Sequence, residues 1–179
     1  MNRNVEIKAR ATDFALQKTR AAELADSPPE LLSQEDTFFR SKRGRLKLRR
    51  FDERRGELIY YERGDAPGPS ESRYMILPTR EPVSLRDALS QALGVSGVVR
   101  KQREVYHVAG TRVHMDTVEG LGKFIELEAV LGPDESREDG HARVRELIDA
   151  LGISDGDLID RAYIDLLLDG DEGTPPTKP

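Results

Sequence analysis

The sequence predicts an α+β fold whose core is an antiparallel sheet of about eight short strands, accompanied by about four helices. The opening segment, residues 2–10, alternates strictly between apolar and polar side chains, as a strand with one buried face does. Strand-like segments then follow one another in runs instead of alternating with helices, which favours antiparallel pairing. Eight strands are enough to close into a small barrel that holds one small ligand.

Hydrophobic patterns and turn residues give the order of the elements along the chain. Strands are expected at 2–10, 35–41, 44–52, 57–63, 73–78, 97–109, 111–118 and 123–131. Helices are expected at 13–25, 84–94, 139–152 and 157–170, the last three each ending at a glycine. The Gly-, Pro- and Ser-rich segment 64–72 predicts a mobile loop. Residues 1–170 therefore form one predicted domain, and residues 171–179 a disordered tail.

Two of the predicted helices carry specific local expectations. In the first helix, Thr12 is expected at the N-cap, and Phe14, Leu16 and Leu24 are expected to be buried. In the second, Ser84 followed by Asp87 resembles a capping pair.

Composition excludes several classes of function. The chain has 179 residues, 28 Lys and Arg against 33 Asp and Glu, and a formal net charge of −5, which argues against general binding to nucleic acids or membrane surfaces. Cysteine is absent, which excludes disulfides, thiolate metal sites and a cysteine nucleophile. No apolar run approaches the length of a membrane span, and no signal-peptide pattern is present, so a cytoplasmic protein is expected.

Charged side chains share one face of several predicted strands. They are Glu6, Lys8 and Arg10 with Asn4; Arg45, Lys47 and Arg49; Arg112, His114 and Asp116; and Glu126 with Glu128. On periodicity alone, a sheet face bathed in water explains this pattern about equally well. However, the signs segregate by strand, and like charges two residues apart repel. Carboxylates suit hard cations such as Mg²⁺ or Mn²⁺, while Arg and Lys suit phosphate oxygens, so the two sets together favour a metal-bound polyphosphate.

Five segments in order resemble the CYTH, or triphosphate tunnel, superfamily, and within it the branch of class IV adenylyl cyclases. The opening "NVEIK" matches the family's Glu-x-Glu-x-Lys pattern except at its first position. The later segments are "LKLR", "VRKQREVYHV", "RVHMDTVEGLGKFIELE" and "RAYIDLLL". The resemblance covers residues 2–168. It implies an eight-stranded antiparallel closed barrel with ionic residues inside and helices packed outside.

The resemblance also implies roles for individual residues. Substrate phosphates are expected to contact Lys8, Lys47, Arg49, Arg63, Lys101 and Arg103. A Mg²⁺ or Mn²⁺ ion is expected to be ligated by Glu6, Asp116, Glu126 and Glu128. Catalysis is expected to depend on Glu6, Lys8, Glu126 and Glu128. Members of the family are often dimers, so a homodimer is an alternative to a monomer.

Two positions depart from the family pattern. Asn4 replaces the first glutamate, and an amide oxygen can ligate a metal but brings no negative charge. Ala162 stands where relatives carry Ser before the tyrosine of the last segment. His114 shares a face with Asp116 and is interpreted as structural.

These observations leave three functions open. The first is a metal-dependent, adenylyl cyclase-like enzyme that converts ATP to cyclic AMP and pyrophosphate. The second is a triphosphatase acting on inorganic tripolyphosphate or thiamine triphosphate, using the same cations. The third is a module that binds a nucleotide or polyphosphate without turnover, an alternative that Asn4 keeps open because a required metal could be lost.

Overall fold

The computed structural model describes residues 2–63 and 69–171. The strands are β1 (Asn2–Arg10), β2 (Glu30–Phe39), β3 (Arg45–Arg50), β4 (Gly56–Arg63), β5 (Ser70–Thr79), β6 (Val95–Val108), β7 (Thr111–Val118), β8 (Gly122–Leu131) and β9 (Leu158–Ile159). The helices are α1 (Phe14–Leu24), α2 (Pro82–Leu93), α3 (Arg137–Leu151) and α4 (Tyr163–Asp171), with a 3₁₀ turn at Asp155–Asp157. The predicted loop falls partly, and the predicted tail almost wholly, outside the described residues.

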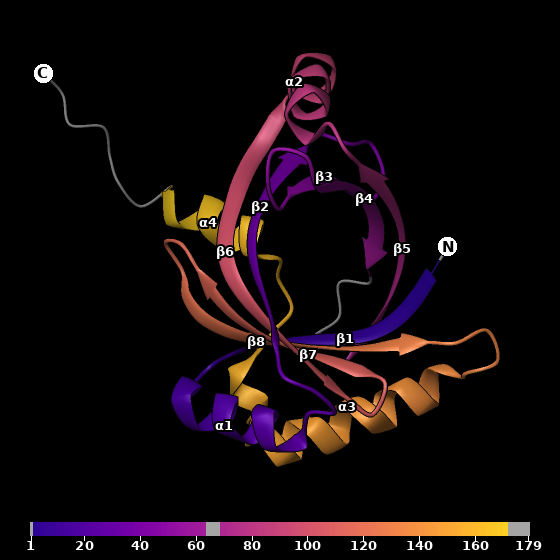
Figure 1. Ribbon diagram of the computed structural model, residues 1–179, viewed down its shortest axis with the longest axis vertical. Coiled ribbons are helices and arrows are strands. Elements are labelled where there is room, and N and C mark those ends of the chain that lie inside the picture. Colours follow the sequence, from indigo (N-terminus) through magenta and orange to yellow (C-terminus); the bar gives the residue numbers. More distant parts are fainter. Residues whose placement is uncertain (1, 64–68, 172–179) are drawn as a thin grey trace, which may run out of the picture.

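The first eight strands form a closed antiparallel barrel, as predicted. Their order is β5-β4-β3-β2-β6-β7-β8-β1, and pairing of β5 with β1 closes the ring. In Figure 1 the strands curve around the line of sight. The closing ladder joins Asn2 through Glu6 to Tyr74 through Ser70, and the short β9 pairs with the next part of β1, at Lys8 and Ala9. One edge of β1 is therefore shared between two partner strands.

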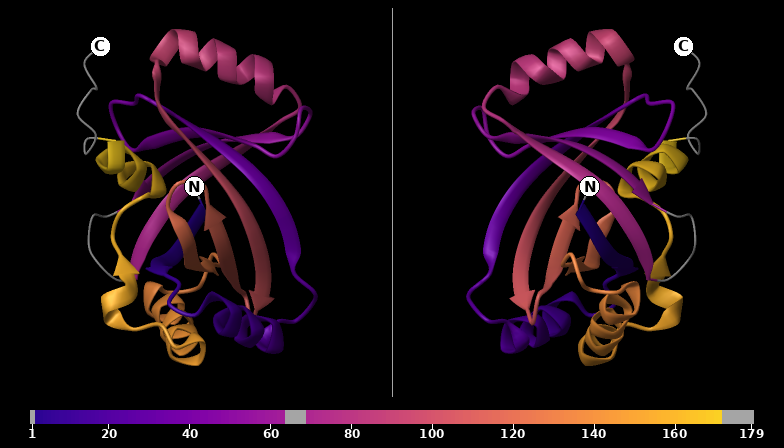
Figure 2. Two further views of the ribbon diagram at one scale, coloured as in Figure 1. Left: turned by 90° about the vertical axis from the view of Figure 1, so that its left-hand side faces the viewer. Right: turned by 90° about the vertical axis from the view of Figure 1, so that its right-hand side faces the viewer.

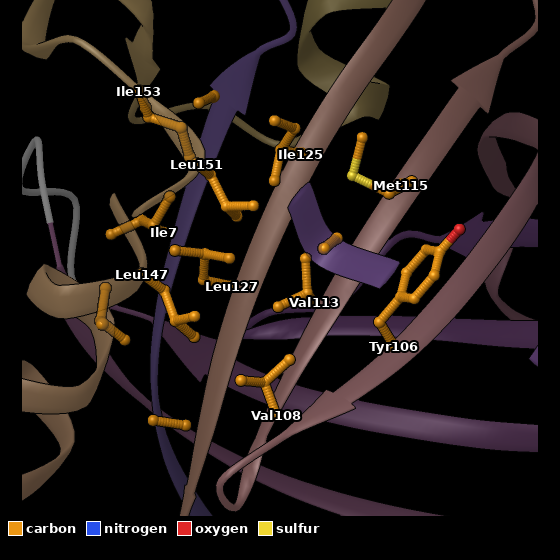
Figure 3. Close-up of a cluster of buried hydrophobic side chains, with 14 of the residues drawn as sticks. Ile7, Tyr106, Val108, Val113, Met115, Ile125, Leu127, Leu147, Leu151 and Ile153 are labelled. Carbon is orange, nitrogen blue, oxygen red and sulfur yellow. The ribbon is translucent and has the colours of Figure 1, made fainter. Parts of the chain in front are cut away.

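The alternation of β1 separates the two faces of the barrel wall. Val5, Ile7 and Ala9 are at most 2% exposed and belong to an apolar core outside the barrel. This core lies between the sheet and the helices α1 and α3, and Figure 3 shows side chains from β1, β6, β7, β8 and α3 meeting there. Asn4, Glu6 and Lys8 line the inside of the barrel instead. Burial of the apolar face thereby fixes which charges face the interior.

The other two helices pack elsewhere on the barrel. Helix α2 lies across the side opposite α1 and α3 (Figure 2) and contacts β2 and β3. Helix α4 packs on β6. A Cβ atom added at Gly97 of β6 would lie 2.4 Å from Ile164 Cδ1, so a larger residue there would require the Ile164 side chain to shift. Arg45 of β3 donates two hydrogen bonds to Asp165, of 2.9 and 2.8 Å, which tie α4 to the barrel.

Three local predictions about the helices were wrong. Asp13, not Thr12, caps α1 by accepting a hydrogen bond from the backbone N–H of Leu16. Leu16 and Leu24 are 45% and 42% exposed, because the buried side of α1 runs through Gln17 and Ala21. Helix α2 begins at Pro82 with Glu81 at its N-cap, so Ser84 caps nothing. Proline at the first helical position explains this earlier start, since its missing N–H needs no partner there.

The predicted helix at 157–170 is also wrong in its first half. Leu158 and Ile159 form β9 and pair with β1, and the helix begins only at Tyr163. The segment extends because β1 offers an unpaired edge beyond the end of its ladder with β5. Asp171, the first residue of the predicted tail, is the last residue of α4, and residues 172–179 are not described. Among the described residues, no helix is long and apolar enough to cross a membrane.

Candidate functional site

The barrel encloses a cavity of about 1230 Å³. Every one of the eight barrel strands contributes inward-facing residues to its wall, and Tyr163 of α4 reaches it from the end of the barrel. The wall includes most of the predicted site residues: Glu6, Lys8, Lys47, Arg49, Lys101, Arg103, Glu126 and Glu128. Residues far apart in the chain are therefore brought to one interior.

A buried aspartate holds the two cations of β3. Asp36 of β2, only 2% exposed, accepts hydrogen bonds of 2.9 Å from Arg49 Nε and Nη2 and of 2.8 Å from Lys47 Nζ. The pairing of β2 with β3 sets this contact, because Asp36 lies opposite Arg49. Burial raises the pKa of Asp36, but the charges of Arg49 and Lys47 outweigh burial and hold the pKa well below its usual range. Asp36 is therefore ionised at neutral pH.

A second buried carboxylate, Asp116 of β7, holds a second pair of cations. Asp116 is fully buried and accepts hydrogen bonds of 2.6 Å from both Nε and Nη2 of Arg103. It also accepts hydrogen bonds from Lys101 Nζ at 3.2 Å and from the Tyr163 hydroxyl at 3.0 Å. Burial and the neighbouring Arg103 lower the pKa of Lys101 to about 7. Asp116 lies behind the cavity wall and orients groups that do reach the cavity.

Glu126 and Glu128 of β8 extend the charged network toward β1. Glu126 forms an ion pair with Lys8, whose Nζ lies 2.7 Å from Oε1, and accepts a hydrogen bond from Arg103 Nη2. Glu128 accepts a hydrogen bond from Arg112 Nη2 at 2.8 Å. Burial raises the pKa of Glu126, but the charges of Lys8 and Arg103 lower it well below its ordinary value. Both carboxylates are thus anions held beside cations.

His114 lies between these two glutamates. Its Nδ1 is 3.6 Å from Glu126 Oε2, and its Nε2 is 3.8 Å from Glu128 Oε2. Burial, together with the charge of Arg103, lowers the pKa of His114 to about 4. The imidazole is therefore neutral at pH 7.

Oxygen atoms that could hold a hard cation gather where β1 meets β8. Glu6 lies directly opposite Glu128 in the ladder. Asn4, 2% exposed, donates its amide N–H to Glu128, while its Oδ1 has no hydrogen-bond partner among the described residues. No group of three or more His, Asp or Glu side chains in residues 2–63 and 69–171 is placed to hold a metal. Two carboxylates and an amide oxygen nevertheless fit Mg²⁺, which keeps several waters and shares its ligands with substrate phosphates.

The remaining predicted residue, Arg63, ends β4, and its side chain lies outside the described atoms. Sequence reasoning missed Asp36 and Tyr163. For Asp36 one signal was available: Lys47 and Arg49 on one strand face require a counter-charge from a neighbouring strand. Tyr163 could not be placed, because its segment was predicted as the middle of a longer helix. These two residues connect β2 and α4 to the network.

Tyr163 is expected to stabilise the fold through its hydroxyl. Its ring lies 4.2 Å from Lys8 Nζ, and its hydroxyl donates to the buried Asp116. Tyr163→Phe keeps the ring contact and removes one hydrogen bond to a buried carboxylate, so the unfolding free energy should fall by about 1.5–3 kcal/mol. Denaturant unfolding measures this. Tyr60→Phe, whose hydroxyl bonds the exposed Glu62, is the control and should change little; equal losses in both variants would contradict the role of Asp116.

Comparisons with known proteins agree with this architecture. The model of the CYTH domain family matches residues 2–163. A Methanocaldococcus jannaschii protein named "Putative adenylate cyclase" is 34% identical over 68 residues, which are 38% of this chain and 39% of the relative. The match therefore spans about two fifths of that relative's length.

Solved structures share the fold at low sequence identity. A Pyrococcus horikoshii protein has a TM-score of 0.78 at 22% identity, covering 93% of this chain and 99% of the other. A Hippeastrum protein, described as a "Putative adenylyl cyclase" that reveals a dominant triphosphatase activity, has a TM-score of 0.68 at 15% identity, covering 95% of this chain and 96% of the other. At these sequence identities the solved structures show only that the fold is shared. The family match, in contrast, is a match of sequence that spans all eight strands of the barrel. The chain belongs to the CYTH domain family.

Proposed function

We propose that this protein is a metal-dependent enzyme acting on a triphosphate, with the conversion of ATP to cyclic AMP and pyrophosphate as the leading reaction. The observation that carries the proposal is the cavity inside the barrel, whose wall presents Lys8, Lys47, Arg49, Lys101 and Arg103 beside carboxylates. Charge-assisted hydrogen bonds from arginine and lysine side chains bind phosphate oxygens strongly.

The interior cations are held in place before any substrate arrives. Asp36 fixes Lys47 and Arg49, and Asp116 fixes Lys101 and Arg103. Preorganised charges aimed at a position where negative charge develops stabilise a transition state without first reorienting. Here they would neutralise the triphosphate and the pyrophosphate that leaves when the ribose 3′-hydroxyl attacks the α-phosphorus.

The acidic side chains supply the other half of the site. Glu6, Glu128 and the Asn4 amide oxygen would hold a divalent cation together with phosphate oxygens, and Glu126 lies beside them. A divalent cation bound there would polarise the phosphate and lower the pKa of the attacking hydroxyl. Glu126 keeps Lys8 and Arg103 oriented toward the cavity.

Hydrolysis of a triphosphate is the second candidate, because the same cations would serve a water attacking the terminal phosphorus. The M. jannaschii relative favours the cyclase by its name, and the Hippeastrum protein shows that this fold also hosts a triphosphatase. The two reactions differ in their products.

Product analysis tests the proposal. The purified protein is incubated with ATP, tripolyphosphate or thiamine triphosphate, each with Mg²⁺ or Mn²⁺, and the products are separated by chromatography. Cyclic AMP with pyrophosphate from ATP establishes the cyclase. Orthophosphate without cyclic nucleotide, accompanied by the matching diphosphate or by pyrophosphate from tripolyphosphate, establishes the triphosphatase. Tight binding without any product would replace both with a binding module.

Substituting Asn4→Glu tests whether the amide limits metal binding. Glutamate cannot donate the hydrogen bond that Asn4 gives to Glu128 and would add a third carboxylate beside Glu6. Without a divalent cation the variant should unfold at a lower temperature than the wild type. Mg²⁺ should raise the unfolding temperature of the variant back to that of the wild type and should also raise its turnover. A thermal unfolding series with and without Mg²⁺ measures this; an Mg²⁺ effect no larger than in the wild type would count against a cation at this position.

A further inference from the structure

Tyr163, the first residue of α4, places its ring among the cations of the barrel interior. The ring centroid lies 4.2 Å from Lys8 Nζ and 5.1 Å from Lys101 Nζ, and both distances are within the range of a cation–π contact. Lys8 belongs to β1 and Lys101 to β6, and the strands β7 and β8 separate β1 from β6 in the barrel. Tyr163 therefore joins two lysines of the proposed phosphate site that strand pairing alone does not bring together.

The position of this ring is fixed from several directions. Tyr163 is only 6% exposed, and its hydroxyl donates a hydrogen bond of 3.0 Å to the fully buried Asp116. The ring packs edge-on against Phe124 of β8, with the two centroids 4.9 Å apart. The next residue, Ile164, is buried against Gly97 of β6. A ring held in this way has little freedom, so it can in turn limit the movement of the two lysines.

An aromatic ring holds a cation in a different way from a carboxylate. Glu126 pairs with Lys8 at 2.7 Å, and its negative charge cancels part of the charge of the lysine. Asp116 does the same to Lys101 at 3.2 Å. The ring attracts an ammonium group through its quadrupole and carries no net charge. Tyr163 therefore restrains both lysines without reducing the positive charge that they present to phosphate oxygens in the cavity.

We infer that Tyr163 is a positioning residue for the triphosphate site, and that its ring holds the ammonium groups of Lys8 and Lys101 where the phosphates bind. The inference rests on the proposed function and deepens it, because the site is then completed by α4, a helix outside the barrel sheet. The two parts of the side chain have separate tasks. The hydroxyl stabilises the fold through Asp116, and the ring determines the affinity for phosphate.

Two substitutions at this position separate the ring from the hydroxyl. Tyr163→Phe keeps the ring and removes the hydrogen bond to Asp116, whereas Tyr163→Leu removes both. Affinity for inorganic tripolyphosphate with Mg²⁺ is measured by calorimetric titration of each folded variant. Tyr163→Phe should bind within about threefold of the wild type, and Tyr163→Leu about 10-fold more weakly, which corresponds to about 1.4 kcal/mol.

A third variant changes the electrons of the ring and keeps its shape. Pentafluorophenylalanine at position 163 has nearly the size of phenylalanine, but its fluorine atoms withdraw the negative charge from the face of the ring that attracts a cation. It should bind tripolyphosphate more weakly than Tyr163→Phe at similar stability. If Tyr163→Leu does not fold, this comparison decides alone.

Phe124→Leu is the matched control. Phe124 is fully buried beside Tyr163, its ring lies 5.3 Å from the guanidinium of Arg10, and it does not line the cavity. The smaller side chain leaves a cavity in the core, so stability should fall. Affinity for tripolyphosphate should stay near that of the wild type.

Each other outcome overturns the inference. A Tyr163→Leu or pentafluorophenylalanine variant that binds as tightly as Tyr163→Phe would show that the ring does not position the lysines. Equal losses in Tyr163→Phe and Tyr163→Leu would assign the effect to the hydroxyl, and an equal loss in Phe124→Leu would assign it to packing. A wild type that binds no tripolyphosphate would instead reject the proposed function itself.

Discussion

Replacing Glu126 with glutamine is expected to lower metal-dependent turnover by about 10²–10³-fold while the fold persists. Glu126 forms an ion pair with Lys8, accepts a hydrogen bond from Arg103 and lines the cavity beside Glu128. Glutamine keeps the shape of the side chain but removes the charge that orients these two cations. Turnover of ATP and of tripolyphosphate, with Mg²⁺, is the measurement.

The control for this variant is Glu119→Gln. Glu119 is an exposed carboxylate in the turn between β7 and β8 and does not line the cavity. Its substitution should leave turnover unchanged, and circular dichroism should show a folded protein in both cases. If Glu126→Gln retained full activity, Glu126 would have no place in the mechanism.

Asp36→Asn is expected to destabilise the free protein strongly and to make its stability depend on a polyanion. The change leaves Lys47 and Arg49, whose side chains are only 14% and 13% exposed, beside each other without their shared carboxylate. Removing one partner of a buried ion pair typically costs about 3–5 kcal/mol, because the remaining charge is desolvated and uncompensated. Tripolyphosphate, which supplies negative charge to the same cations, should recover much of this loss.

Denaturant unfolding with and without tripolyphosphate measures both parts of the prediction. Glu35→Gln is the matched control, since Glu35 pairs with Arg50 and Arg100 and lies one residue away, outside the cavity. The Arg50 and Arg100 side chains are 32% and 55% exposed, and ion pairs with exposed partners contribute less than buried ones. This variant should therefore lose less stability than Asp36→Asn and gain no extra protection from the ligand. Tripolyphosphate that stabilises Asp36→Asn no more than the wild type would mean that the β3 cations do not bind it.

The contribution of Asp36 should also depend on pH in a defined direction. Its pKa in the folded protein is held well below the ordinary value of 3.8, so the stabilisation is fully present above that value. It is lost as the pH falls below about 4, where the unfolded chain takes up the proton. The difference in unfolding free energy between wild type and Asp36→Asn should therefore shrink on acidification; a difference that stayed constant down to pH 2 would contradict the pKa shift.

Alternation could predict which side chains share one face of a strand, whereas closure of the strands into a barrel was implied by the resemblance to the CYTH superfamily. On β1 and β8, apolar residues at every second position leave only one burial option, and this option places Glu6, Lys8, Glu126 and Glu128 inside. The same reasoning places Lys47 and Arg49. Local patterns therefore sufficed wherever one face of a strand is clearly apolar.

The rest depends on contacts between distant segments. Asp36 follows Glu35 and precedes Thr37, so its strand is polar on both faces at this point, and only pairing with β3 reveals its partners. Leu16 is exposed although it is apolar, because α1 meets the core through Ala21. The position of Tyr163 follows from β9, which forms only because β1 has a free edge. Tertiary packing decides such positions.

Binding of tripolyphosphate by wild type and Arg49→Ala in the presence of Mg²⁺, measured by calorimetric titration, tests the central claim most directly. The guanidinium of Arg49 lines the cavity wall and is held in place by the hydrogen bonds that it donates to Asp36. The wild type should bind one tripolyphosphate per chain, and the variant should bind it at least 10-fold more weakly. A wild type that binds no tripolyphosphate, or a variant that binds it as tightly, would contradict a triphosphate site inside the barrel.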